Sequence, residues 1–333
     1  MNFKKIWIIK KIGIILVGFV FVFMIIPSLC WTKDYPNKPI EFVNPYAPGG
    51  ANDLCIRIIG EKMADFLGQP IVVVNKVGGA AAVGSIYVAN SKPDGYTLLG
   101  NTGGFVTRPL YDPRVPYRYT QFRPIGIPAK HENVLCVNKN LPTKNIAELI
   151  TYAKGNPGAL SYSIAGKGGV TYLAMEYLKY KTHLTDIHLQ CVPYQGDAPA
   201  LLAILGNHVQ VSVTNIAFAL QYIKSNSIQP IAILSKKRDP LLPEIPTSFE
   251  QGFQDVVASS YFLWLAPVGT PDEIIKKLEN TVEKALQDKG VQEKLLKIDI
   301  TAGFMNSKET KAFLDNEIKM WEKIIKEANL ATK

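Results

Sequence analysis

The sequence predicts an α/β fold made of two similar lobes that are joined by a hinge. A strand, a glycine turn, a helix and a second strand follow one another between residues 40 and 74, and the same order returns between residues 160 and 194 with different residues. Such βαβ units build mainly parallel sheets. The 333 residues are 47% hydrophobic and include 25 Gly and 22 Pro, which indicates large cores with many short connections and excludes a disordered or collagen-like chain.

The first βαβ unit opens with a strand expected at residues 40–46 and a tight turn at residues 47–51. Apolar residues then recur at helical spacing, with Asn52 as the expected N-cap and Gly68 as the helix stop. The β-branched run at residues 71–74 is typical of a strand buried on both faces. A loop, a short helix and a third strand are expected next, at residues 78–84, 85–90 and 96–99.

The second unit repeats this order further along the chain. A strand is expected at residues 160–164, a glycine turn at residues 165–169 and a helix at residues 171–179. A strand at residues 188–194, a helix at residues 199–205 and a strand at residues 209–213 are expected to follow. The glycine turns of both units then sit at the carboxyl ends of strands, where open α/β sheets bind ligands.

The hinge is expected where the chain passes twice between the lobes. Residues 122–127 and 134–137 predict the first crossing, and residues 228–234 predict the return. The first lobe would then comprise residues 31–128 and about 235–333, and the second lobe about residues 129–234. Two amphipathic helices, separated near residues 302–303, are expected in the tail from residue 272 to residue 329.

The beginning of the chain predicts export. Lys4, Lys5, Lys10 and Lys11 precede an uncharged apolar run at residues 12–26, the pattern of a secretory signal over residues 1–30. The run is short for a membrane span of about 20 residues, although residues 6–30 could serve as an uncleaved anchor. Subtracting these four lysines from the net charge of +9 leaves +5, which weakens a nucleic-acid interpretation. We expect a periplasmic or extracytoplasmic protein.

The signal could end in two ways. Ser28 and Cys30 offer small residues for cleavage before Trp31, whereas Leu29 stands where lipidation of Cys30 would favour a small residue. A lipid anchor at Cys30 is thus only weakly indicated. The other cysteines, Cys55, Cys136 and Cys191, lie in apolar patterns without a CxxC motif, so we expect buried hydrophobic residues rather than disulfides.

Motifs of catalysis are scarce in this sequence. None of the four histidines has the spacing of a zinc motif, and there is no GxSxG elbow. The glycines around Lys167 match neither the GxGxxG fingerprint nor a P-loop. We therefore expect no catalytic residue, no metal and no cofactor, and a binding protein rather than an enzyme.

Two glycine turns that open helices, at residues 48–51 and 166–169, are the main indication of a binding site. A helix start presents unpaired N–H groups and a partial positive charge, which suit a carboxylate or a phosphate. Lys76 and Lys167 could add positive charge, although exposed lysines are usually only solvated. Asp53 is expected to interact favourably with the helix dipole rather than to contact an anion.

Motifs along the chain resemble those of the Bug proteins, the TctC-like extracytoplasmic solute receptors of tripartite tricarboxylate transporters. Two of them are Asn44-Pro-Tyr-Ala-Pro-Gly-Gly-Ala-Asn-Asp53 and Ala266-Pro-Val-Gly-Thr-Pro271. Further ones lie at residues 35–40, 67–70, 74–78, 93–99, 152–158, 192–196 and 243–247. The resemblance implies a two-lobed periplasmic-binding-protein fold of type II, with two Rossmann-like lobes joined by a hinge.

The resemblance also implies ligand contacts, which fall in three groups. They are Tyr46, Ala47, Gly49 and Gly50 in the first loop, Thr102 and Gly103 after the third strand, and Ala165, Gly166, Thr171 and Asn215 in the second lobe. The family often has Asn-Arg-Pro-Gly-Ala-Gly-Gly-Asn at residues 75–82, where this chain has Asn-Lys-Val-Gly-Gly-Ala-Ala-Ala. It often has polar residues at positions 164, 169 and 170, and an Asp-Asn pair at residues 214–215. These departures imply a less polar and less acidic pocket.

By this resemblance the protein captures a small organic anion, a carboxylate or a related solute, and delivers it to membrane permease subunits. We expect a monomer that has no nucleic-acid partner. Two alternatives stay open, a receptor that feeds a sensor kinase and a two-lobed enzyme that acts on a carboxylic acid.

Overall fold

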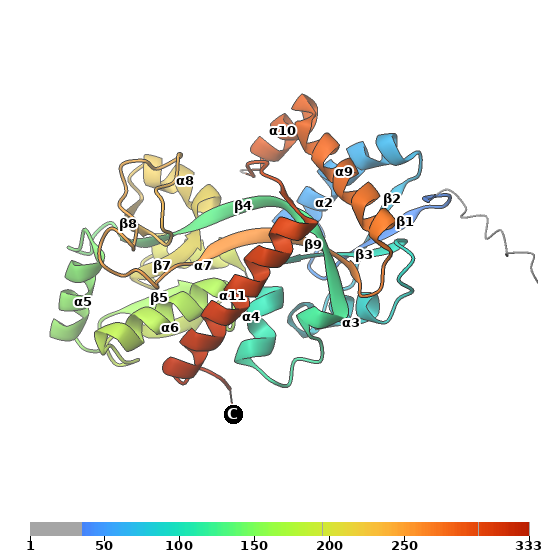
Figure 1. The fold of residues 1–333 in the computed structure, drawn as a ribbon. Coiled ribbons are helices and arrows are strands. Elements are labelled where there is room, and N and C mark those ends of the chain that lie inside the picture. Colours follow the sequence, from blue (N-terminus) through green and yellow to red (C-terminus); the bar gives the residue numbers. More distant parts are fainter. Residues whose placement is uncertain (1–34, 195, 299, 333) are drawn as a thin grey trace, which may run out of the picture. The chain divides into compact units, whose positions relative to one another are not determined.

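The structure is a computed structural model that describes residues 35–194, 196–298 and 300–332. The predicted signal, with Cys30, lies outside the described residues. Within them, none of the helices is both long enough and apolar enough to span a membrane. Residues 38–333 form one unit, whose arrangement is shown in Figure 1.

Strands and helices alternate along most of this unit. The strands are β1 (Ile40–Asn44), β2 (Ile71–Asn75), β3 (Thr97–Thr102), β4 (Phe122–Asn138), β5 (Ser161–Ile164), β6 (Gln190–Pro193), β7 (Val211–Asn215), β8 (Ile228–Ile233), β9 (Ser259–Pro267) and β10 (Met305–Asn306). The helices are α2 (Ala51–Leu67), α3 (Ala82–Ala89), α4 (Gly104–Tyr111), α5 (Ile146–Gly155), α6 (Val170–Thr182), α7 (Asp197–Leu205), α8 (Ile216–Lys224), α9 (Asp272–Gln287), α10 (Lys289–Leu296) and α11 (Ser307–Glu327).

In the described part of the chain the strands form one ten-stranded sheet, with the order β2-β1-β3-β9-β4-β7-β5-β6 and with β8 and β10 each paired to β4. The strands β2, β1 and β3 are parallel in one half, and β7, β5 and β6 are parallel in the other. Parallel strands end at the same edge, so α2, α3 and α4 start together in the first half and α6, α7 and α8 start together in the second. The predicted two-lobed α/β fold is confirmed.

Two strands join the halves. β4 is one strand of 17 residues, which pairs with β9 through Glu132 and with β7 and β8 from Asn133 onward. β9 pairs with β3 as well as with β4, and Figure 1 shows both long strands passing from one group of helices to the other. The return was predicted at residues 228–234, but β8 pairs with the second-half part of β4, whereas β9 pairs with β3 of the first half.

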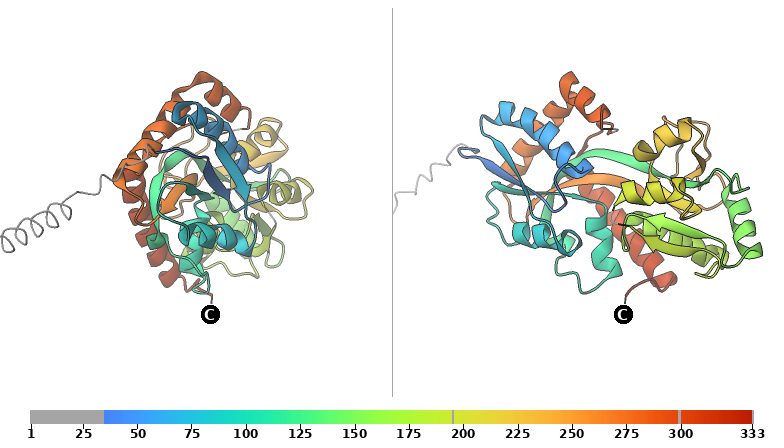
Figure 2. Two further views of the ribbon diagram at one scale, coloured as in Figure 1. Left: turned by 90° about the vertical axis from the view of Figure 1, so that its right-hand side faces the viewer. Right: turned by 180° about the vertical axis from the view of Figure 1, so that it is seen from behind.

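Each lobe has its own hydrophobic core. Val43, Leu99 and Leu263 belong to the first, together with Leu314 from α11. The second is built around Leu135, Tyr162, Leu173 and Val213, with Trp321 from the far end of α11. Helix α11 thus packs on both lobes, as the view from behind in Figure 2 also shows.

The boundary after the second lobe can be sharpened from this packing. Val256 and Ala258 pack in the core of the second lobe, and Leu242 packs against Ile204 and Ile233 there. The predicted boundary near residues 234–235 stays a prediction, and we propose that the chain re-enters the first lobe in β9 instead.

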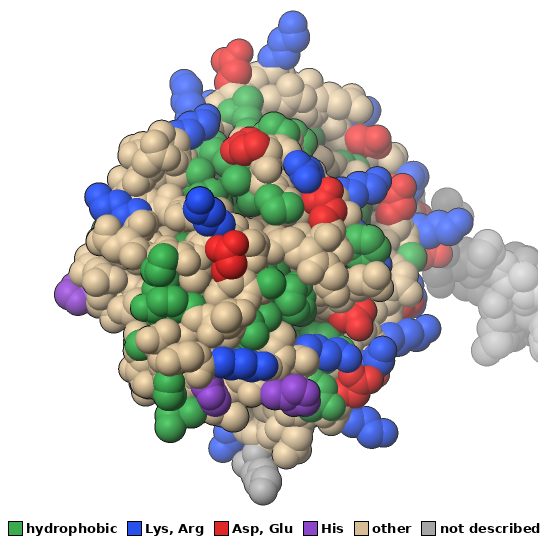
Figure 3. All heavy atoms as spheres, turned by 90° about the vertical axis from the view of Figure 1, so that its left-hand side faces the viewer, with side chains coloured by type: hydrophobic (Ala, Val, Ile, Leu, Met, Phe, Trp, Pro, Cys, Tyr) green, Lys and Arg blue, Asp and Glu red, His purple; other side chains and the backbone are tan. Residues whose placement is uncertain are grey.

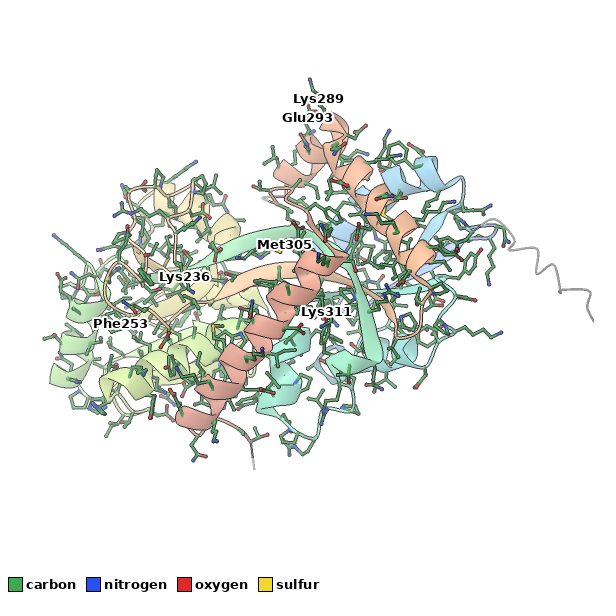
Figure 4. All side chains as sticks on the ribbon, in the orientation of Figure 1. Lys236, Phe253, Lys289, Glu293, Met305 and Lys311 are labelled. Carbon is green, nitrogen blue, oxygen red and sulfur yellow. The ribbon has the colours of Figure 1, made fainter. Side chains whose placement is uncertain are left out.

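The described residues of the tail form three helices instead of the expected two. The first amphipathic segment breaks at Asp288, whose side chain accepts a hydrogen bond from the N–H of Val291 and caps α10. The predicted separation near residues 302–303 lies between α10 and α11. Met305 then lies beside β4 (Figure 4), where it pairs with Ile127.

The helix ends and the cysteines match the predictions closely, with one exception at the start of α2. Gly68 ends α2 in a left-handed conformation, with φ 67°, as predicted. Gly50, not Asn52, is the N-cap of that helix. Cys55 and Cys136 are buried and Cys191 is half-buried, and all three are free thiols.

Candidate functional site

The loop after β1 is held by polar side chains of its own lobe. The N–H of Tyr46 donates to Oδ1 of Asn44 (3.2 Å), and its carbonyl accepts from Nδ2 of Asn44 (3.3 Å) and Nδ2 of Asn75 (3.1 Å). The N–H of Gly49 donates to Oδ2 of Asp53 (2.9 Å). These bonds fix the loop without any contribution from a ligand.

Asp53 is the centre of this network. Its buried carboxylate accepts from Nε (2.9 Å) and Nη2 (3.1 Å) of Arg57 and from the amides of Asn44 (3.2 Å) and Asn75 (2.9 Å). Burial by itself would raise the pKa of Asp53, but the bonds from Arg57, Gly49, Asn75 and Asn44 outweigh it and lower the pKa to about 2. Asp53 therefore has a structural role, beyond the helix-dipole role that was expected.

The hydroxyl of Tyr46 connects this loop to the end of β3. It donates to Oδ1 of Asn101 (2.8 Å) and lies 2.9 Å from Oγ1 of Thr102. The amide of Asn101 in turn donates to Oγ of Ser85 on α3 (3.1 Å). The predicted residues Tyr46 and Thr102 are thus in direct contact, and Asn101 connects them to α3.

The loop after β5 is built differently. Gly166 and Gly168 have φ of 140° and 77°, which other residues rarely adopt. Its one side-chain hydrogen bond from the described residues comes from the other lobe, where Oγ1 of the buried Thr107 on α4 donates to the carbonyl of Gly168 (2.8 Å). The shape of this loop depends on its glycines and on α4.

The helices after these two loops start without a side-chain cap. The N-caps are Gly50 for α2 and Gly169 for α6, and neither can offer a side-chain acceptor. Side-chain caps are present at the starts of other helices, where Asn145 caps α5, Asn215 caps α8, Asp288 caps α10 and Asn306 caps α11. The first N–H groups of α2 and α6 thus lack a side-chain acceptor and can bind an anion.

The first and second lobes meet beside these helix starts. A Cβ placed on Gly103 would lie 3.5 Å from Cγ1 of Val170, the first residue of α6. Tyr46, Thr102 and Gly103 of the first lobe therefore lie near the start of α6, which also carries the half-buried Thr171. The geometry is that of a polar site between two loops, made mostly of backbone and hydroxyl groups.

The remaining predicted residues lie around this place. Ala47, Gly49 and Gly50 are exposed in the first loop, and Ala165 and Gly166 are half-buried in the second. Asn215 ends β7, and its Oδ1 accepts from the N–H of Ala217 (2.8 Å), which makes it the N-cap of α8. No hydrogen bond among the described residues joins Asn215 to either loop.

The structure adds detail on three residues near the loops. Gly50 has φ −72° and ψ 164°, which any residue can adopt, so the first loop needs its glycine conformation at Gly49, with φ 77°. Lys76 lies over the ring of Tyr87, 3.9 Å from its centroid, rather than free in the site. Lys167 is exposed.

Sequence reasoning missed three polar residues of this region. Asn101 is the next-to-last residue of β3, Arg108 lies on α4, and Asp197 is in the first turn of α7. Burial raises the pKa of Asp197 to about 6, and the described residues give it no hydrogen bond. In the sequence, these three residues are marked only by their positions near the carboxyl ends of predicted strands. In the described part of the chain, no group of three His, Cys, Asp or Glu residues could hold a metal ion.

This fold and site define a two-lobed protein of the periplasmic-binding-protein class. A family model described as tripartite tricarboxylate transporter family receptor matches residues 55–330, and the chain belongs to that family.

Three solved structures extend the comparison. Periplasmic binding protein BugD is 30% identical, with TM-score 0.76 and coverage of 90% of this chain and 100% of its own. Rpa4515 of R. palustris with adipate is 31% identical, with TM-score 0.77 and coverage of 90% and 99%. MatC of Rhodopseudomonas palustris with bound malate is 27% identical, with TM-score 0.75 and coverage of 87% and 100%. The expected membership of the Bug receptors is confirmed.

Proposed function

We propose that the protein binds a small carboxylate between its lobes and delivers it to the membrane permease of a tripartite tricarboxylate transporter. The observation that carries this proposal is the pair of uncapped helix starts, α2 and α6, at the ends of glycine loops. Each offers N–H groups and the positive end of a helix dipole to a negative group. The hydroxyls of Tyr46, Thr102 and Thr171 would complete the site.

The relatives support a carboxylate as the ligand. Adipate is bound to Rpa4515 and malate to MatC, and both proteins share this fold over nearly their whole length. The family description supports the permease as the partner. Figure 3 shows basic and acidic side chains interspersed on the end of the second lobe, without the single-sign surface that a nucleic-acid partner would favour.

The proposal also covers the cellular location and the oligomeric state of the protein. The receptor acts in the periplasm as a monomer, after export by the N-terminal signal, and it catalyses no reaction. Binding is the whole of its chemistry, because backbone N–H groups and hydroxyls stabilise a carboxylate without changing it.

Calorimetric titration with adipate, malate and citrate, each compared with its neutral amide, tests the proposal. We expect binding of at least one carboxylate and none of the amides. Replacing Gly166 by Ala should weaken binding, because a side chain hinders close approach to the loop backbone. Gly158→Ala is the matched control, since both positions have positive φ and open space around them. Binding of the amides alone, or equal effects of the two variants, would contradict the proposal.

A further inference from the structure

Arg108 differs from the other five arginines of the chain in its partners. Arg57, Arg114, Arg123 and Arg238 each pair with a carboxylate within the described residues. Arg118 donates to the backbone carbonyls of Pro113, Val115 and Tyr117. Arg108 has one acceptor in the described part of the chain, the carbonyl of Ala80, which Nη1 contacts.

The position of Arg108 is central to the site. It lies on α4, one residue after the Thr107 that holds the second-lobe loop. A Cβ on Gly168 would lie 3.5 Å from Cγ of Arg108, and one on Gly104 would lie 3.4 Å from its Nε. The guanidinium is therefore next to the end of β3, and its stem is next to the second-lobe loop.

The first-lobe loop is also within reach of this charge. Burial raises the pKa of the Tyr46 hydroxyl, and the positive charge of Arg108 partly offsets that rise. Tyr46 and Ala80 belong to the loops after β1 and β2. Arg108 is thus close to the loops after β1, β2 and β5.

The guanidinium has unused donors. Its Nε is shielded from solvent and has no acceptor among the described residues, and the same residues give Nη2 no hydrogen bond. An arginine side chain is always charged, and a shielded donor without a partner costs free energy. Nε and Nη2 form the edge of the guanidinium that binds a carboxylate through two parallel hydrogen bonds.

We propose that Arg108 is the residue that recognises the charge of the ligand, by binding one carboxylate through Nε and Nη2. The inference rests on the proposed function and adds a side-chain ion pair to the backbone groups already described. It assigns Nη1 a separate task, which is to position the loop at Ala80. A carboxylate takes the place of the partner that the described residues do not provide.

Titration of the Arg108→Met and Arg108→Lys variants with adipate, malate and citrate tests this. We expect Arg108→Met to weaken carboxylate binding by about 10- to 100-fold and Arg108→Lys by less, because lysine keeps the charge but loses the paired geometry. Arg114→Met is the matched control, since Arg114 is exposed and pairs with Asp112 at 2.8 Å. It should bind as the wild type does.

A purely structural role for Arg108 gives a different pattern. It would lower the melting temperature of the ligand-free Arg108→Met variant and leave the preference for carboxylate over amide intact. A folded Arg108→Met variant that keeps this preference, or binds within about threefold of the wild type, overturns the inference alone. If the wild type binds none of the three carboxylates, the proposed function fails and the role of Arg108 with it.

Discussion

The two glycine loops occupy matching places in the two lobes, yet different forces hold them. In the first lobe, Asn44, Asn75 and Asp53 bond to the loop backbone. In the second, the described residues supply one side-chain bond, and it comes from Thr107 of the other lobe. The first loop is therefore held in place by its own lobe, whereas the second is shaped by its contact with the first lobe.

Two acids, one in each lobe, show a similar contrast. Asp53 and Asp197 both lie in the first turn of a helix that starts at the carboxyl end of a strand, where the dipole favours a negative charge. Four donors lower the pKa of Asp53, whereas burial raises that of Asp197. Hydrogen-bond donors at Asp53 and burial at Asp197, rather than the helix dipole that both acids share, set the direction of each pKa shift.

The largest expected effect is on the first loop. Asp53→Ala leaves the amides of Asn44 and Asn75 and the N–H of Gly49 without their acceptor, so we expect a loss of about 3 kcal/mol in the free energy of unfolding at pH 7. Because the folded pKa is lowered from 3.8 to about 2, the stability from Asp53 is complete above pH 4 and declines as the pH falls to 2. Urea denaturation across this range measures it. An equal loss in Asp197→Ala would remove the contrast between the lobes.

A second prediction concerns the glycines. In Gly168→Ala, φ of 77° and a Cβ only 2.9 Å from Cδ1 of Tyr111 should together cost about 2 kcal/mol. Gly50→Ala should cost almost nothing, since the backbone of Gly50 is extended and the new Cβ meets its nearest neighbour at 3.5 Å. Thermal unfolding of both variants compares them, and similar losses would argue against the difference between the loops.

Asp197 should show the opposite pH dependence to Asp53. Its folded pKa is raised from 3.8 to about 6, so ionisation destabilises the fold above pH 4 and does so fully above pH 6. At about 1.4 kcal/mol per pKa unit this rise is worth about 3 kcal/mol, and the partial exposure of Asp197 screens it, so Asp197→Asn should add about 1.5 kcal/mol of stability at pH 8 and none at pH 3. The urea concentrations at the midpoint of unfolding, compared between the wild type and Asp197→Asn at pH 3 and pH 8, test this prediction. A gain of the same size at pH 3 would show that charge is not the cause.

The smallest effect is expected at Ala80 and Ala81. Both residues have left-handed backbone conformations, with φ of 54° and 76°. The receptors whose motifs this sequence resembles often have glycine at these two positions. Ala80→Gly and Ala81→Gly should each stabilise the protein by about 0.5 kcal/mol, since relief of strain exceeds the added entropy of the unfolded chain. Differential scanning calorimetry can resolve this, and a loss of stability would mean that the loop is not strained.

Much of the fold could be predicted from the sequence, because strand, glycine turn and helix follow one another in short local patterns. The crossing in β9 could not, since an apolar run indicates a buried strand but not its partners. Residues 228–234 and the β9 segment look alike in this respect. Pairing is decided by tertiary packing.

The candidate site likewise has features that the sequence predicts and features that it does not. Its glycine loops are visible in the sequence, because positive φ strongly favours glycine. Arg108 could not be predicted as a site residue, because a single arginine in a short helix belongs to no sequence pattern. The feature that singles it out, a lack of any carboxylate partner among the described residues, is visible only in the structure. The role of Asp53 was also hidden, since its donors come from positions 44, 49, 57 and 75.

Hydrogen exchange followed by mass spectrometry tests most directly whether a carboxylate binds between the two loops. Peptides that cover residues 46–53 and 165–171 would be compared with and without the carboxylate that binds most tightly in calorimetry. We expect new protection in both, and a larger change in the second loop, because the first is already held by its own side chains. Protection confined to other parts of the chain, with both loops unchanged, would contradict the account.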